Sequence, residues 1–381
     1  RLLGAGVYDH GYVLGYERLT DHAPNVDGPR HRLWRIRAKQ IIAATGAIER
    51  PLSFAGNDIP GVMLASAVRD YVVNYGVSVG DRTVVVTNND DAYRTAIAIK
   101  KAGLDVPAII DARVPATDSP LMAEAKAMGI RVLIGHGVAK VRGLKRVVSV
   151  QVCLQAGEGA VIEEIHCDCV AMSGGWSPVV HLYSHCGGKL NWDAGNAFFR
   201  PDADRAPTSH DGQPFVACAG AANGHMALDA VLSDARAVGQ SVSDAAGFAP
   251  NASDAPQAHA VEEAPMTPVW VMPRGASQKL RMKAWLDYQN DVKVSDVMLA
   301  AQEGYESVEH TKRYTTLGMA TDQGKLSNIN GLATLADALG EDIPQVGTTT
   351  FRPPYTPISM GAIAGEARGA VFQPIRKTPI H

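Results

Sequence analysis

The densest group of side chains able to bind a ligand lies between residues 312 and 330, where cationic, hydroxyl and amide groups are combined. A Lys and an Arg beside hydroxyls can neutralise a phosphate group through charge-assisted hydrogen bonds. The alternative is a solvated basic face, in which Glu309 pairs with Arg313 at the i, i+4 spacing of a helix and uses its charge. The group consists of Lys312, Arg313, Thr315, Thr316, Gln323, Lys325, Asn328 and Asn330.

Two turns of small residues are candidates for close contact with a dinucleotide. The first ends a short apolar strand expected over 40–44, and its glycine permits close approach because it has no side chain. The second lies between a strand expected over 215–219 and a helix expected over 227–240, whose N-terminus attracts phosphate. The alternative for both is an ordinary packing turn. The residues concerned are Thr45, Gly46 and Ala47 in the first turn, and Gly220 and Ala221 in the second.

A strand–helix–strand unit in the first third of the chain has the layout of a nucleotide-binding domain without its glycines. Thr87 and Asn89 stand at the first two glycine positions, where side chains would block a pyrophosphate. Asp90 and Asp91 add negative charge and are expected to cap the following helix. Asp111 has the spacing of a ribose-binding acid, but without the glycines it is better interpreted as a strand-end residue. We therefore predict that this unit is retained for structure and does not bind NAD.

The segment from Leu286 to Leu332 has the framework of a small iron–sulfur domain without its cysteines. Such clusters need thiolate or occasionally imidazole ligands, and all five cysteines of the chain lie at or before Cys218. A cysteine-ligated cluster is therefore excluded in this segment, which is expected to form a compact helical module. The side chains at the four matching positions are Asp287, Gln289, Asp322 and Ser327.

Several motifs in and around this module resemble the α subunits of heterotetrameric sarcosine oxidases. The most specific are Val-Glu-His-Thr-Lys-Arg-Tyr-Thr-Thr at 308–316 and Gly-Met-Ala-Thr-Asp-Gln-Gly-Lys at 318–325. The resemblance continues upstream in Ala-Thr-Gly-Ala-Ile-Glu-Arg-Pro at 44–51 and Gly-Gly-Trp-Ser-Pro at 174–178. It continues downstream in the proline-containing run at 348–357 and so covers nearly the whole chain.

The resemblance implies one component of a flavin enzyme that oxidises sarcosine to glycine, forms peroxide and passes the one-carbon unit to tetrahydrofolate. In that family the α subunit carries NAD, half of an FMN interface and a C-terminal folate domain, while FAD and the amine-oxidising site belong to the β subunit. The chain would then assemble with β, γ and δ subunits in the cytoplasm and be inactive alone. Its candidate FMN-binding residues are Lys312, Arg313, Thr315, Gln323 and Lys325.

Two alternatives stay open at this point. One is a subunit of an opine-type or other amine dehydrogenase, although such relatives often retain the cluster cysteines. The other is a non-catalytic scaffold that only binds partner subunits. The sequence contains no His-Glu-x-x-His metal motif, no Gly-x-Ser-x-Gly nucleophile motif and no other complete catalytic constellation.

The predicted fold is α/β. Paired dinucleotide-binding domains of the FAD/NAD-linked reductase kind are followed by a small helical domain that resembles a [2Fe–2S] domain without its cluster. The first domain lacks its own Gly-x-Gly-x-x-Gly fingerprint. The expected boundaries are 1–65 and 156–245 for the remnant of the first domain, 66–155 for the inserted second domain, 246–279 for an Ala/Pro/Asp-rich linker, 280–338 for the helical domain, and 339–381 for the start of a truncated aminomethyltransferase-like domain.

Composition excludes several classes of function. A formal net charge of −3 gives no drive toward nucleic acid or anionic membranes. No apolar run reaches the roughly 18 residues that span a bilayer. Cysteines without a framework spacing favour a reducing compartment. Cys167 and Cys169 are expected to be buried thiols on one face of a strand, and not zinc ligands.

Overall fold

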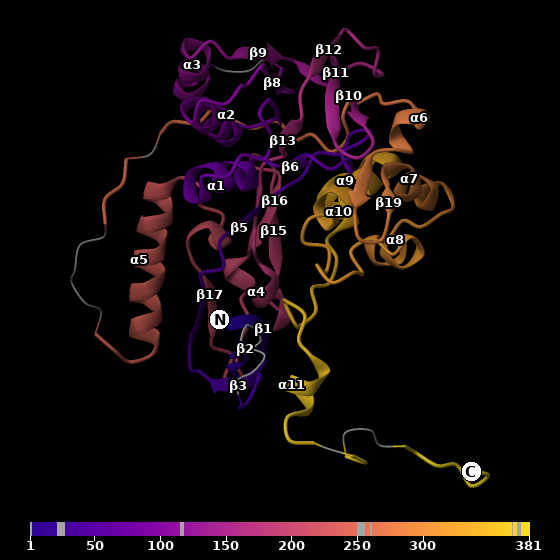
Figure 1. The fold of residues 1–381 in the computed structure, drawn as a ribbon. Coiled ribbons are helices and arrows are strands. Elements are labelled where there is room, and N and C mark those ends of the chain that lie inside the picture. Colours follow the sequence, from indigo (N-terminus) through magenta and orange to yellow (C-terminus); the bar gives the residue numbers. More distant parts are fainter. Residues whose placement is uncertain are drawn as a thin grey trace.

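The computed structural model describes residues 2–20, 27–114, 118–249, 256–259, 261–367, 369–371 and 375–381 (Figure 1). Its centre is a five-stranded sheet with the strand order β6-β13-β7-β8-β9. Every neighbouring pair in this sheet is parallel. The strands are β6 (Val62–Leu64), β7 (Thr83–Thr87), β8 (Ala108–Asp111), β9 (Arg131–Ile134) and β13 (Cys169–Ser173).

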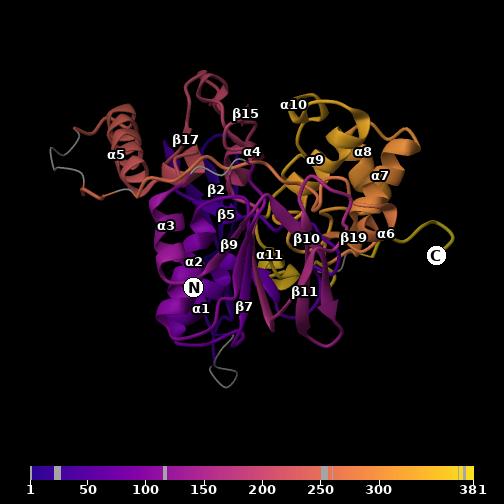
Figure 2. The same cartoon turned by 90° about the horizontal axis from the view of Figure 1, so that it is seen from above.

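The two faces of the parallel sheet belong to two different cores, because successive side chains of a strand point to opposite faces. Val85 and Ile109 pack against three helices. Val84 and Ile110 pack against an antiparallel three-stranded sheet. Figure 2 shows these layers on either side of β7. The helices are α1 (Ala65–Tyr75), α2 (Asp91–Lys101) and α3 (Pro120–Ala127), and the antiparallel strands are β10 (His136–Gly143), β11 (Val147–Leu154) and β12 (Glu163–His166).

The cysteine pair does not share one face, so that prediction is wrong. Cys169 begins β13 and packs in the core that contains the helices. Cys167 precedes the strand and packs in the core under the antiparallel sheet. Side chains alternate between the two faces only within a strand, and β13 starts at Cys169, so the alternation does not extend back to Cys167. Both thiols are buried, and burial raises the pKa of Cys167 to about 12.

A second group of elements surrounds the two candidate turns. In it β4 pairs in parallel with β17, β5 pairs with β14, and β1, β2 and β3 form an antiparallel meander. Helix α5 stands beside β17 at the edge of the molecule (Figure 1). The elements are β1 (Leu2–Tyr8), β2 (Tyr12–Arg18), β3 (His31–Arg37), β4 (Ile41–Ala43), β5 (Ala47–Glu49), β14 (Trp176–Pro178), α4 (His181–His185), β15 (Leu190–Asp193), β16 (Phe198–Pro201), the 3₁₀ turns η1 (Ala203–Arg205) and η2 (Gly220–Asn223), β17 (Val216–Cys218) and α5 (Leu228–Ala245).

The C-terminal helices form a separate core around Leu286, Val297, Leu332 and Leu335. Asn330 joins this module to the rest of the chain, because its Nδ2 donates to the carbonyl of Pro51 at 2.9 Å. The elements of the module are α6 (Gln278–Arg281), β18 (Trp285–Asp287), β19 (Val292–Lys293), α7 (Val294–Gln302), α8 (Val308–Thr315), α9 (Asn328–Leu339) and α10 (Ile343–Val346), and α11 (Met360–Ala364) follows along β3.

The second half of the expected linker, residues 261–276, is packed against the protein and is called the strap below. Met272 is buried, and its N–H donates to the carbonyl of Ser53 at 2.9 Å. Ala276 is also buried. Composition did not indicate this packing, because the contacts join residues more than one hundred positions apart.

The predicted α/β class and the helical domain that follows it are confirmed. Across the part of the chain that the structure describes, no helix is both long and apolar enough to cross a bilayer.

Candidate functional site

The two predicted turns meet at the carboxyl ends of β4 and β17. The N–H of Ala219 donates to the carbonyl of Ala43 at 3.2 Å, which holds the two strand ends together. Gly46 has a φ of +74°, and a Cβ built there would point into open space. The structure therefore places Thr45–Ala47 beside Gly220–Ala221, and the backbone at Gly46 leaves room for a ligand.

The segment that follows β14 holds the first turn in place. Thr45 Oγ1 donates to the carbonyl of Val179 at 2.6 Å, and the N–H of Val179 donates to the carbonyl of Gly46 at 2.9 Å. Ala47 lies opposite Pro178 in the β5–β14 pair. The Thr45 hydroxyl proton is thus used within the protein, so that its oxygen is left only as an acceptor.

The second turn is anchored by an acid on α5. Asp234 accepts from the N–H of Gly220 at 2.7 Å and from Asn223 Nδ2 at 3.0 Å. Helix α5 begins only at Leu228, and no side chain caps its N-terminus. The N–H groups at the start of that helix therefore belong to the first turn of α5, and the Asp234 contact fixes the position of Gly220 relative to the helix.

The cations of α8 are partly used within the protein. Arg313 Nη2 lies 3.3 Å from Glu309 Oε2 at the i, i+4 spacing, and the Arg313 side chain is 56% exposed. Lys312, at the neighbouring position, is half-buried. The side chains of Thr315 and Gln323 donate to carbonyls of their own segments. Lys312 and Arg313 therefore remain the members of the predicted set best able to meet a phosphate.

Lys325 points inward, apart from that pair. Its Nζ donates to the carbonyl of Asp322 at 2.9 Å and to the carbonyl of Tyr355 at 2.5 Å. Burial lowers the pKa of Lys325. None of the contacts that the structure describes joins Lys325 to Lys312 or Arg313, so the three cations are not shown as one cluster.

Two of the residues that stand at cysteine positions, Asp287 and Gln289, connect two loops by hydrogen bonds. Asp287 is buried, and its carboxylate accepts from the N–H groups of Gln289 at 2.9 Å and Gly318 at 2.7 Å. Gln289 Oε1 accepts from the Thr321 hydroxyl at 2.9 Å. Asp322 accepts from the N–H of Gly324 at 3.0 Å. The loop from 318 to 324 is thus ordered by carboxylate and amide side chains.

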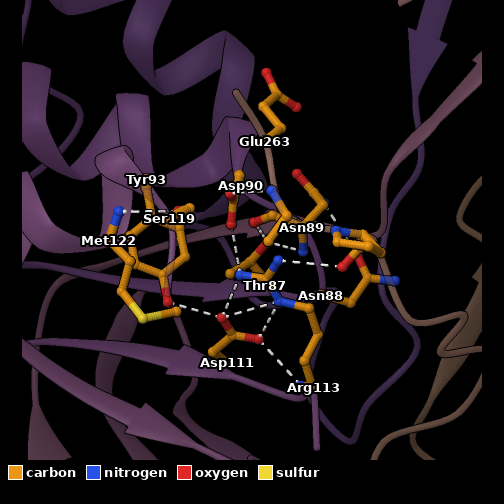
Figure 3. Close-up of polar contacts among 12 residues, drawn as sticks. Thr87, Asn88, Asn89, Asp90, Tyr93, Asp111, Arg113, Ser119, Met122 and Glu263 are labelled. Atoms are coloured by element: carbon orange, nitrogen blue, oxygen red, sulfur yellow. Dashed lines mark hydrogen bonds and ion pairs between the residues drawn. The ribbon is translucent and has the colours of Figure 1, made fainter. Parts of the chain in front are cut away.

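A buried ion network lies at the carboxyl ends of β7 and β8, within the second nucleotide-like unit (Figure 3). The Arg113 side chain is 1% exposed, and its Nη2 is 2.7 Å from both Asp90 Oδ1 and Asp111 Oδ2. The Tyr93 hydroxyl donates to Asp111 at 2.7 Å. Burial acts to lower the pKa of Arg113, but its hydrogen bonds and charge contacts with Asp111 and Asp90 raise it overall. Arg113 neutralises both acids, and no sequence motif had singled it out.

Asp90 does not cap α2, so that prediction is wrong. Its carboxylate makes no bond to the helix N-terminus, because the buried guanidinium of Arg113 is a stronger partner than a neutral N–H. Asn89 acts in its place, since its Oδ1 accepts from the N–H of Asp91 at 3.1 Å. The Asp91 carboxylate is neutralised by Arg69 at 3.0 Å.

The strap covers the loop between β7 and α2 from outside. Asn88 Nδ2 donates to the carbonyl of Thr267 at 2.7 Å, and the N–H of Thr267 donates back to the carbonyl of Asn88 at 3.2 Å. The N–H of Ala264 donates to Asp90 Oδ2 at 2.8 Å. In a nucleotide-binding unit the pyrophosphate lies at this turn between strand and helix. Here the chain itself occupies the position.

Residues 281–366 match the family model described as the sarcosine oxidase A3 domain. The α subunit of sarcosine oxidase from Corynebacterium sp. (strain P-1) is 41% identical over 99% of this chain and 39% of its own length. The chain belongs to the sarcosine oxidase α-subunit family. It spans well under half the length of that relative. One of the opine oxidase subunits of Rhizobium meliloti (strain 1021) is more distant, at 21% identity over 88% of this chain and 78% of its own.

A solved structure shares the fold. The crystal structure of L-proline dehydrogenase from P. horikoshii matches 95% of this chain and 64% of its own chain, with a TM-score of 0.66 and 19% identity. At that identity the likeness concerns the fold alone. It agrees with the predicted α/β class of this member of the sarcosine oxidase α-subunit family.

Two charged residues of the 44–51 family motif are structural, which the sequence did not reveal. Glu49 is buried and accepts from the N–H and hydroxyl of Ser66 at 2.9 and 2.6 Å. Arg50 is buried as well, and its Nε donates to the carbonyl of Gly174 at 3.1 Å. Burial lowers the pKa of Arg50 to about 9. Arg50 thus ties the first motif to the Gly-Gly-Trp-Ser-Pro motif.

For this member of the sarcosine oxidase α-subunit family, NAD should not bind at the second nucleotide-like unit. Titration with NAD is expected to leave the backbone amide NMR signals of Asn88–Ala92 unmoved, because the strap and the side chains of Thr87 and Asn89 fill the turn. The signals of Thr45–Ala47 are the internal comparison. Saturable shifts at Asn88–Ala92 would refute the prediction.

Proposed function

We propose that this chain is the scaffold and flavin-interface part of a sarcosine oxidase α subunit. The observation that carries the proposal is 41% identity over 99% of the chain. The complete enzyme would oxidise sarcosine to glycine, with formation of peroxide and transfer of the one-carbon unit to tetrahydrofolate through a C-terminal domain. β, γ and δ subunits would be its partners, and the β subunit would hold FAD and the amine-oxidising site.

In this proposal α8 faces the FMN that is held between this chain and the β subunit. FMN, when bound, supplies electron transfer at the interface. Lys312 and Arg313 would donate to its phosphate, because their charges are adjacent and the exposed pair with Glu309 is weak. Asn290 supports the end of the helix, since its Nδ2 donates to the carbonyl of Thr316 at 2.8 Å.

NAD would bind at the meeting point of the two small-residue turns. The open space at Gly46 fits close approach of a ligand to the backbone. The first turn of α5 would receive the phosphates through its uncapped N–H groups and the helix dipole, with one acid, Asp229, in the same turn. The cytoplasm is the proposed compartment.

The alternative substrate class is an opine, and its support is the distant relative from an opine oxidase. Identity of 21% to that protein against 41% to the sarcosine oxidase relative favours sarcosine. A scaffold without any cofactor contact is the second alternative, and cofactor analysis of the assembled complex distinguishes it.

The proposal is tested by turnover. The chain is produced alone and together with the β, γ and δ subunits of a sarcosine oxidase, and peroxide formation is measured with sarcosine and with an opine. We expect peroxide from sarcosine only with the complex, because the chain holds no complete catalytic constellation. Turnover of sarcosine by the chain alone, or of the opine in preference to sarcosine, would contradict the proposal.

A further inference from the structure

A cavity of about 60 Å³ lies where the segment after β14, the start of α9 and the C-terminal segment meet. That volume is several times the roughly 10–15 Å³ that one water molecule needs. Its walls are largely apolar and include Val180, Phe199 and Leu332. The polar side chains of the lining come from three segments: Ser177 and His181 from β14 and α4, Lys325 and Asn328 from the start of α9 and the residues before it, and Thr348 from the C-terminal segment.

Four polar atoms of residues that line this cavity lack hydrogen-bond partners within the described part of the chain. His181 is 8% exposed, and neither of its ring nitrogens makes a hydrogen bond there. Ser177 Oγ and Asn328 Oδ1 are also unpaired. The His181 ring is held in place by Phe351, whose centroid is 4.1 Å away. Buried polar groups in proteins are normally paired, so several unpaired groups around one cavity indicate a bound molecule.

The charge of the cavity is positive. Lys325 is the charged member of its lining, and no Asp or Glu is found among the described residues that form it. Two of the three N–H groups of Lys325 donate to carbonyls, which leaves one for a ligand. Burial and the charges of Lys325 and His185 lower the pKa of His181 to about 3. His181 is therefore a neutral ring with one donor and one acceptor nitrogen.

We propose that this cavity binds a small aliphatic carboxylate. Lys325 donates to the carboxylate from one segment, and Ser177 and His181 donate from another. One lysine balances a single negative charge, and the apolar walls receive the carbon end of the ligand. The inference does not rest on the flavin interface, because all of these groups belong to this chain.

Calorimetric titration of the purified chain with acetate and with glycine tests this site. Comparing the two ligands distinguishes two classes of carboxylate that the cavity could bind, a simple carboxylic acid and an amino acid. We expect saturable 1:1 binding of at least one of them, weakened about tenfold or more by Lys325→Met, which removes the charge and its hydrogen bond. Lys101→Met removes an exposed lysine of α2 that is not part of the cavity and is the matched control, with unchanged affinity.

A second variant keeps the test decisive if Lys325→Met does not fold. His181→Phe retains the ring that packs on Phe351 and removes both nitrogens, so it should weaken binding several-fold while the circular dichroism spectrum is unchanged. Three results would overturn the proposal. The first is that neither ligand shows saturable binding. The second is that the folded Lys325→Met and His181→Phe variants bind with the same affinity as the unaltered chain. The third is that inorganic phosphate binds more tightly than either carboxylate.

Discussion

Replacement of Arg113 by alanine should lower the free energy of unfolding by about 3–5 kcal/mol, the range for breaking a buried ion network. The guanidinium is 1% exposed and lies 2.7 Å from Asp90 and Asp111, whose side chains are fully buried. Its removal leaves two carboxylates in the interior without a counter-charge, and it also frees the strap from its contact at Pro265. Chemical denaturation followed by circular dichroism measures the change.

Arg131→Ala is the matched control for this prediction. Arg131 begins β9 of the same parallel sheet and pairs with Glu163, but its side chain is 51% exposed. Exposed pairs contribute at most about 1 kcal/mol. An Arg113→Ala variant no less stable than Arg131→Ala would show that the buried network does not hold the unit together.

Replacement of Arg313 by alanine should reduce the FMN content of the assembled complex by about tenfold to over a hundredfold. A charge-assisted contact contributes roughly 1.5–3 kcal/mol, and each 1.4 kcal/mol is about tenfold in affinity. The isolated chain should stay folded, because the helical pair with Glu309 that is lost contributes only about 0.3–0.5 kcal/mol. Flavin released from the purified complex is quantified by chromatography.

Arg142→Ala provides the comparison for Arg313. Arg142 has the same 56% exposure and a carboxylate partner, Glu164, at 3.6 Å, but it lies on β10. Equal FMN content in both variants would mean that Arg313 is an ordinary surface residue. Unfolding of the isolated Arg313→Ala chain would instead assign it a structural role.

Local patterns predicted the elements around the two turns. The strands expected over 40–44 and 215–219 are β4 (Ile41–Ala43) and β17 (Val216–Cys218), and the helix expected over 227–240 is α5 (Leu228–Ala245). The two strands are visible in the sequence because they are short apolar runs that end before a turn with Gly. The pairing of Arg313 with Glu309 was likewise visible as a helical spacing.

Contacts between distant segments were not predictable in this way. Arg113 finds Asp90 only after β8 is placed beside β7, and the strap reaches Asn88 from 179 residues away. His181 and Lys325 meet at one cavity because α9 lies against the segment after β14. The presence of Asp287 and Gln289 at positions of cysteine ligands was visible in the sequence, and the absence of an iron–sulfur cluster stays a prediction. The hydrogen bonds that order the loop follow from geometry that spacing does not encode.

The central claim is that this chain contributes to a flavin site shared with a partner protein. The most direct measurement is the FMN content of the β subunit purified by itself, of this chain by itself, and of the two purified as a complex. The account predicts that FMN is retained fully only in the complex. Full retention of FMN by the isolated β subunit, unchanged when this chain is added, would contradict it.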